Sequence, residues 1–430
     1  MRFTIFLLLT LPLSIFGADR KFFTNPHEKH KEILRKSQKE KVSWWEGDHL
    51  FKDFGGLKEY LAKHGISFSS TYVIDFAANP VGGMKKGIAQ ASGWGLDVLY
   101  DFGKNGDALE GWLLYASMVW RFGTNLSSRK IENQFNVQQV FGGQNVRLVN
   151  LYLKKTFIPG VLWGKAGRLD AGNNFLQSDL YYNFINNAFD GNPVAVFYNT
   201  PFRAFPNGVW GAYLQTDPTD YLQGKVAVYN TNPNVNRNRT HGLDFSFRSP
   251  EGAMIVTEWG YLLNSKGKGL PGHYRFGVLG LTGKKEKFLG GKERNYSFYL
   301  MLDQMVYQDA CNPNNGLIPF LAFLYAPPNR NLMPYFFVAG IVSKGLIPKL
   351  EKDRTSFGVA YGRFSSDLRK KQRAEGLSQQ TQETVLELNH RFTVNPWFYI
   401  QPMVQYVITP KGISSTSNAW VFGLQSEVVF

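Results

Sequence analysis

Polar and apolar residues alternate along most of the chain after its first 65 residues. Near the end, for example, Phe398 and Ile400 fall on one face, and Gln401 and Gln405 fall on the other. Successive side chains of a β-strand point to opposite faces, so this period of two predicts half-buried strands. The pattern recurs in roughly 16 to 18 segments separated by Gly, Asn, Pro and Lys, as expected for many antiparallel strands. The chain is therefore predicted to be all-β.

The chain ends in an amphipathic strand whose apolar face carries Trp420, Phe422, Leu424, Val428 and Phe430. A soluble two-sheet sandwich would show the same alternation, but such an apolar terminal strand would leave it with an edge prone to aggregation. A closed barrel pairs its last strand with its first and leaves no edge in the lipid. We therefore expect a transmembrane antiparallel β-barrel of about 16 strands. Phe430 is expected to be the contact for the bacterial barrel-assembly machinery.

The N-terminus has the pattern of a secretory signal peptide. A positive start at Arg2 precedes an apolar run over residues 3–16, and the small residues Gly17 and Ala18 follow. The run is too short for a membrane-spanning helix, which needs ~20 residues. The expected organisation is a cleaved signal peptide at 1–18, a basic, partly helical periplasmic segment at 19–64 and an outer-membrane barrel at 65–430.

Composition and charge are consistent with this organisation. Aromatic residues make up 15% of the chain and no later segment is apolar enough for a spanning helix, as expected when lipid-facing and water-facing residues alternate. The net charge of +15 suggests an acidic counterpart. Lipopolysaccharide or anionic solutes fit an exported protein better than nucleic acid does, and lysines on solvated loops would give the same charge.

Cys311 is the single cysteine of the chain. An intrachain disulfide is therefore excluded. An unpaired cysteine in an exported protein is either an idle loop residue or the site of an intermolecular disulfide.

The residues give no sign of catalysis. Of the seven histidines, only His241, His273 and His390 fall within the expected barrel, and none belongs to a recognisable nucleophile motif. We therefore expect no enzyme activity, no cofactor and no bound metal. A structural or adhesive surface protein is the remaining alternative to a channel, because a barrel fold alone does not specify function.

Several stretches resemble the carbohydrate-selective porin family OprB. They follow one another along the chain from Trp44 onward: 55–66 (GGLKEYLAKHGI), 165–170 (KAGRLD), 173–175 (NNF), 344–348 (KGLIP), 358–364 (GVAYGRF), 387–397 (ELNHRFTVNPW) and 405–412 (QYVITPKG). The resemblance implies a 16-stranded barrel with loops folded into the lumen. Overall likeness is greatest to a branch of that family that takes up L-arginine, but no substrate motif distinguishes arginine from sugar.

The segment 168–190 is the best candidate for a channel constriction. Its candidate solute contacts are Arg168, Asp170, Asn173, Asn174, Asp179, Asn183 and Asp190. Carboxylates bind a guanidinium bidentately, and the interleaved aromatic rings can stack on guanidinium or on sugar. We predict at least one of the three aspartates at the narrowest level of the lumen. The alternative is a surface loop, because Asp and Asn also favour turns.

Overall fold

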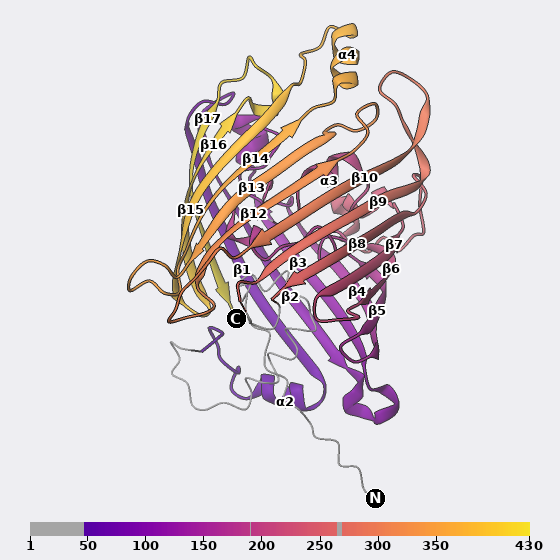
Figure 1. Ribbon diagram of the computed structural model, residues 1–430, viewed down its shortest axis with the longest axis vertical. Helices are drawn as coiled ribbons and strands as arrows, with labels where there is room; N and C mark the ends of the chain where they lie inside the picture. Colours follow the sequence, from indigo (N-terminus) through magenta and orange to yellow (C-terminus); the bar gives the residue numbers. More distant parts are fainter. Residues whose placement is uncertain (1–46, 190, 265–268) are drawn as a thin grey trace, which may run out of the picture.

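The computed structural model describes residues 47–189, 191–264 and 269–430. They form one closed antiparallel sheet, seen in Figure 1 as a barrel of tilted strands. The strands are β1 (Ile66–Val81), β2 (Gly87–Asp101), β3 (Trp112–Gly123), β4 (Asn145–Ile158), β5 (Leu162–Leu169), β6 (Val209–Thr216), β7 (Leu222–Tyr229), β8 (Met254–Leu263), β9 (Gly272–Glu286), β10 (Lys292–Gln304), β11 (Tyr307–Gln308), β12 (Gly316–Tyr325), β13 (Tyr335–Lys344), β14 (Arg354–Arg363), β15 (Gln382–Asn395), β16 (Phe398–Ile408) and β17 (Ala419–Val429). The two-residue β11 continues β10 along β12. Sixteen long strands therefore make the wall, and the predicted fold is confirmed.

The barrel closes between its first and last strands. β17 pairs with β1 in antiparallel register, with Leu424 opposite Phe76 and Phe422 opposite Ala78. The backbone N–H of Phe430 donates to the carbonyl of Ser70 at 2.9 Å. The apolar terminal strand is therefore built into the wall, as the sequence predicted.

The alternation along the strands separates the outside of the barrel from its inside. On β17, Trp420, Phe422 and Leu424 are exposed on the outer surface, whereas Val421 and Gln425 are buried in the interior. A barrel in a membrane needs an apolar outer face, because polar side chains that face the lipid find no water to bind. The polar side chains therefore face the interior of the barrel.

The longest connections gather at one end of the barrel. They join β3 to β4, β5 to β6, β7 to β8 and β14 to β15, and span 124–144, 170–208, 230–253 and 364–381. The helix α4 (Ser366–Ala374) stands at this end, opposite the C-terminus (Figure 1). Outer-membrane barrels carry long loops outside and short turns toward the periplasm. We therefore call this the extracellular end.

Two of these connections, 124–144 and 170–208, fold into the barrel. They contain the short helices η4 (Ser127–Ile131), η5 (Tyr181–Asn183) and α3 (Ala195–Asn199). Their aromatic rings pack against the wall: the Phe135 and Phe336 ring centroids are 5.6 Å apart, as are those of Phe184 and Phe320. The interior therefore has a hydrophobic core of its own.

The described N-terminal segment lies at the periplasmic end. Helix α2 (Leu57–Lys63) is followed by His64 as its C-terminal cap. The Phe51 ring stacks on Phe430 at a centroid distance of 5.8 Å, beside the seam. The remaining short helices are η2 (Phe102–Asn105), η3 (Asp107–Leu109), η6 (Pro233–Asn236), η7 (Asn238–Thr240) and η8 (Pro410–Gly412). None of the described helices has the length and apolarity to cross a bilayer. The predicted signal peptide lies outside the described residues.

Candidate functional site

Carboxylates on β15 hold both inserted loops against the barrel wall. Glu383 accepts the backbone N–H groups of Gln134 and Phe135, each at 2.7 Å. Glu387, four residues further along the same face of the strand, accepts those of Ile185 and Asn186, each at 2.8 Å. Both carboxylates are fully buried. A carboxylate that accepts two N–H groups satisfies donors that a buried loop would otherwise leave unpaired.

Neighbouring wall residues bind the carbonyl groups of the same loops. Arg391 donates to the Tyr182 carbonyl at 2.6 Å, and Gln401 donates to that of Asn183 at 2.8 Å. Similar bonds from β16, β7 and β9 hold the carbonyls of Val137, Asn174, Gln177 and Asn199. The loops are therefore fixed on both their donor and acceptor sides, and they narrow the lumen as a rigid constriction.

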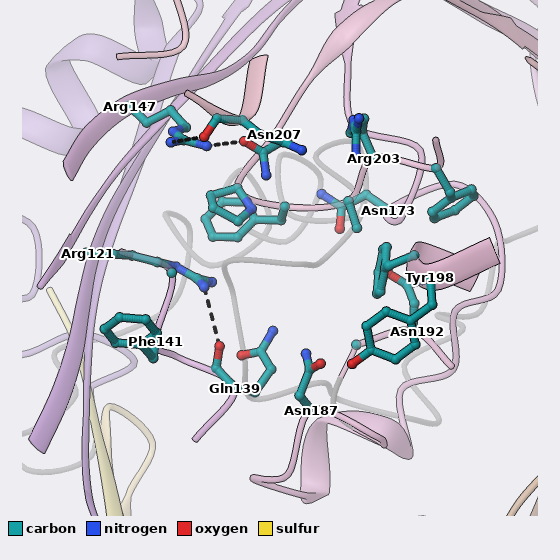
Figure 2. A pocket seen from close by; sticks show the side chains of 18 of the residues that line it. Arg121, Gln139, Phe141, Arg147, Asn173, Asn187, Asn192, Tyr198, Arg203 and Asn207 are labelled. Carbon is teal, nitrogen blue, oxygen red and sulfur yellow. Dashed lines mark hydrogen bonds between the residues drawn. The ribbon is translucent and has the colours of Figure 1, made fainter. Parts of the chain in front are cut away.

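A cavity of about 400 Å³ lies beside the inserted loops in the extracellular half of the barrel. Its walls come from β3, β4, the two loops and the β7–β8 connection (Figure 2). It is lined by Arg121, Gln139, Phe141, Gly142, Arg147, Asn173, Tyr182, Asn187, Gly191, Asn192, Phe197, Tyr198, Phe202, Arg203, Ala204, Phe205, Pro206, Asn207, Asn236 and Asn238. No acidic residue occurs among these lining residues, which all belong to the described part of the chain.

Three arginines from three elements converge on this cavity. Arg121 reaches in from β3, donates to the Gln139 carbonyl at 3.4 Å, and lies 5.2 Å from the ring centroid of Phe205. Arg147 comes from β4 and Arg203 from the 170–208 loop (Figure 2). Burial lowers the pKa of the Arg203 guanidinium, an effect that the charge of Glu251 opposes. Guanidinium groups present several planar donors to an oxygen-rich solute.

The rest of the lining combines amides with aromatic rings. Asn173, Asn187 and Asn192 face the cavity from the loop, and Tyr198 stands beside them (Figure 2). The Tyr198 hydroxyl donates to the Gln134 carbonyl at 2.8 Å, which ties one loop to the other. Amide groups can both donate and accept, and ring faces stack on the C–H faces of a sugar.

Of the residues predicted from the sequence, Asn173 lines the cavity. Asp170 is buried and accepts the Asn173 backbone N–H and the Asn150 amide, each at 2.7 Å. Burial raises the pKa of the Asp170 carboxyl, and these hydrogen bonds oppose the rise. The Asn174 amide donates to the Asp170 carbonyl at 2.8 Å. Asp170 and Asn174 therefore shape the loop and lie away from the cavity.

The other predicted residues occupy different parts of the interior. Arg168 donates to the Asp244 carbonyl at 2.9 Å, and Asn183 accepts from Arg354 at 3.3 Å. Asp179 does not line the cavity, but its side chain is exposed to solvent on the inserted loop. Asp190 lies outside the described residues. The prediction of a lumen-facing aspartate therefore rests on Asp179, which stands apart from the three arginines of the cavity but lies within reach of the charges of Arg275 and Arg354.

Arg121 and Arg147 were not among the predicted site residues, although the sequence carried a signal for both. Arg121 lies between Trp120 and Phe122, and Arg147 between Val146 and Leu148. The period of two places each arginine on the polar, inward face. A charged residue on that face, next to a long connection, is the pattern that would have identified them.

Comparisons with known proteins agree with this geometry. A family model described as "Carbohydrate-selective porin, OprB family" matches residues 85–430. Porin B of Pseudomonas aeruginosa is 27% identical over 425 residues, which cover 89% of this chain and 91% of the relative. The putative porin QuiX of Acinetobacter baylyi is 25% identical, over 90% and 94% of the two chains.

The solved structures agree as well. The high-pH structure of Pseudomonas putida OprB superposes with a TM-score of 0.83 at 25% identity, and the match covers 90% of this chain and all of that one. The family and the barrel fold indicate an outer-membrane location. Since the family model spans far more than half of the sequence, this chain belongs to the OprB family of outer-membrane porins.

Proposed function

We propose that this porin admits small carbohydrates by passive diffusion through the constricted barrel. The observation that carries the proposal is the cavity, in which arginine and asparagine donors face aromatic rings. A selective channel must replace part of a solute's hydration and still release it. Several weak donors spread over one cavity meet that requirement for a solute with many hydroxyl groups. The description of the family as carbohydrate-selective supports the same assignment.

Liposome swelling tests the proposal. Because the cavity measures about 400 Å³ and the loops around it are fixed, we expect glucose to enter porin-containing liposomes rapidly and the trisaccharide raffinose to enter slowly. Liposomes without protein provide the baseline. Swelling in glucose at that baseline, with protein shown to be inserted by its ion conductance, would refute carbohydrate uptake.

L-arginine is the second candidate solute, suggested by overall sequence likeness. Asp179 is the observation in its favour, since its carboxylate is exposed on the inserted loop and can attract a cation. The positive charges of Arg275 and Arg354 weaken that attraction. The arginine-lined cavity opposes it, because like charges repel. Arginine uptake therefore depends on a path that passes Asp179 rather than the three arginines.

Substitution of Asp179 separates the two solutes. Asp179→Asn keeps size and hydrogen bonding and removes one charge, so an arginine channel should lose arginine flux while its glucose flux changes little. Asp107→Asn, on the exposed periplasmic turn after β2, is the matched control. Equal effects on the two solutes would show that Asp179 acts on the loop structure and would remove the argument for arginine.

Residues 1–18 are proposed to direct export and to be cleaved, followed by a periplasmic segment up to residue 64 and the barrel from 65. Cys311 is exposed on the periplasmic connection before β12, and an intermolecular disulfide through it remains a proposal. Lipopolysaccharide remains the proposed counterpart of the basic outer loops.

A further inference from the structure

The segment 50–63 begins on the lipid-facing side of the barrel, next to the seam between β1 and β17. Successive side chains of β1 alternate between the two faces, so Phe68 points outward like the exposed Phe76. Phe430 continues the outer face of β17 in the same way. The Phe54 ring meets that of Phe68 edge-on at a centroid distance of 5.6 Å, and Phe51 stacks on Phe430. These contacts place the start of the segment beside the outer wall rather than beneath the opening of the lumen.

Hydrogen bonds fix the segment in this place. The Leu50 N–H donates to the carbonyl at the end of β17 at 2.8 Å, and Lys58 Nζ donates to the Phe430 carbonyl at 3.2 Å. Lys58 Nζ also lies 5.2 Å and 5.5 Å from the ring centroids of Phe54 and Phe68. The first turn of α2 is therefore tied to the seam, at the lower, periplasmic end of the barrel in Figure 1.

Helix α2 presents two of its faces to different surroundings. Residues four positions apart share a face of a helix. Lys58 and Ala62 form one such pair: Lys58 reaches the seam and Ala62 is buried, so this face packs on the barrel. Glu59 and Lys63 form another pair, with Lys63 Nζ 3.0 Å from Glu59 Oε1 and both side chains exposed. The charged pair needs water around it, so this second face points away from the barrel and from the membrane.

The third face of α2 is apolar and exposed. Leu57 and Tyr60 are three positions apart on it and are 46% and 61% exposed, and the nearby Phe51 is 54% exposed. Three large apolar side chains gathered at one place indicate a surface that meets another apolar phase. The apolar phase next to them is the lipid, because Phe51 and its neighbours already pack on the lipid-facing residues of the seam.

We propose that residues 50–63 bind the phospholipid surface of the periplasmic leaflet and anchor the barrel seam to it. Phe51, Leu57 and Tyr60 enter the lipid at headgroup level, and the pair of Glu59 and Lys63 remains in periplasmic water. Aromatic side chains favour this interface, where the ring is in lipid and a hydroxyl group stays hydrated. Short amphipathic helices bind membranes in the same way. The anchoring does not depend on which solute the channel admits.

Spin labels on α2 test the proposal in the full-length protein. Cys311→Ser removes the native thiol, and Tyr60→Cys or Lys63→Cys then provides a single labelling site. The porin is reconstituted in vesicles of phosphatidylethanolamine and phosphatidylglycerol. Collisions of the label with oxygen, which concentrates in lipid, are compared with collisions with a water-soluble nickel chelate. The oxygen-to-nickel ratio is expected to be several-fold higher at position 60 than at position 63, which is the matched control on the charged face.

The possible outcomes are distinct. Equal ratios at positions 60 and 63, with the nickel chelate reaching both, would place the apolar face in water and overturn the proposal. Low access of both reagents to position 60 would show that protein covers this face, which overturns it as well. Heat-modifiable migration shows that each labelled barrel has assembled. Leu57→Cys, on the same face, provides the measurement if Tyr60→Cys does not assemble.

Discussion

Replacement of Phe422 and Leu424 by Asp is expected to prevent stable insertion into the outer membrane. Both side chains are exposed on the outer face of β17, the strand that closes the barrel against β1. The double variant loses the transfer of two large apolar groups into lipid and places two carboxylates there. Together these changes cost roughly 5 kcal/mol. That amount is comparable to the whole stability of many folded domains, ~5–15 kcal/mol.

Heat-modifiable migration of the outer-membrane fraction on gels measures this effect. Leu377→Asp is the matched control, because Leu377 is equally apolar and exposed but belongs to the extracellular connection after α4 rather than to a strand. The control should assemble as the unaltered protein does. Normal insertion of the Phe422→Asp, Leu424→Asp double variant would contradict the assignment of this face to lipid.

The wall of the barrel was predictable because each strand carries its own evidence. The alternation of Phe398 and Ile400 with Gln401 and Gln405 follows from strand geometry and depends on no distant residue. The C-terminal strand was equally clear, since its open edge needs a partner strand, and β1 supplies it with Phe76 opposite Leu424.

The interior was less predictable because it depends on contacts between distant segments. Asp170 looked like a solute contact, but in the structure its carboxylate caps the turn at Asn173 and binds Asn150. Aspartate serves both purposes, and sequence alone does not separate them. Arg203 joins Arg121 only because the inserted loop returns to the wall near β3. No local periodicity encodes that return.

The constriction itself depends on two carboxylates that have no counterpart in local sequence patterns. Glu383 and Glu387 look like ordinary polar-face residues of β15, yet each binds two backbone N–H groups of an inserted loop. Their removal leaves three buried donors, and the partly buried Gln134 N–H, without these acceptors. At ~1–3 kcal/mol for each of the three buried groups left unsatisfied, the loss is roughly 3–9 kcal/mol. The loops are therefore expected to leave their inserted position when both carboxylates are removed.

The double variant Glu383→Ala, Glu387→Ala is therefore expected to release the loops while the barrel stays intact. Its single-channel conductance should rise several-fold, and raffinose should enter liposomes nearly as fast as glucose, because the fixed loops no longer exclude the larger sugar. Limited proteolysis should cut within 124–144 or 170–208 in the variant only.

Asp97→Ala is the matched control for this experiment. Asp97 is an interior carboxylate too, but it accepts from Tyr115 at 2.6 Å and from Ser69 at 3.5 Å, which are both wall residues. The Asp97→Ala variant therefore removes an interior charge but none of the hydrogen bonds to the inserted loops. The variant should discriminate between glucose and raffinose as well as the unaltered porin does. If the double variant also excludes raffinose, the hydrophobic packing of Phe135 and Phe184 holds the loops without the carboxylates, and the constriction is set by the interior core instead.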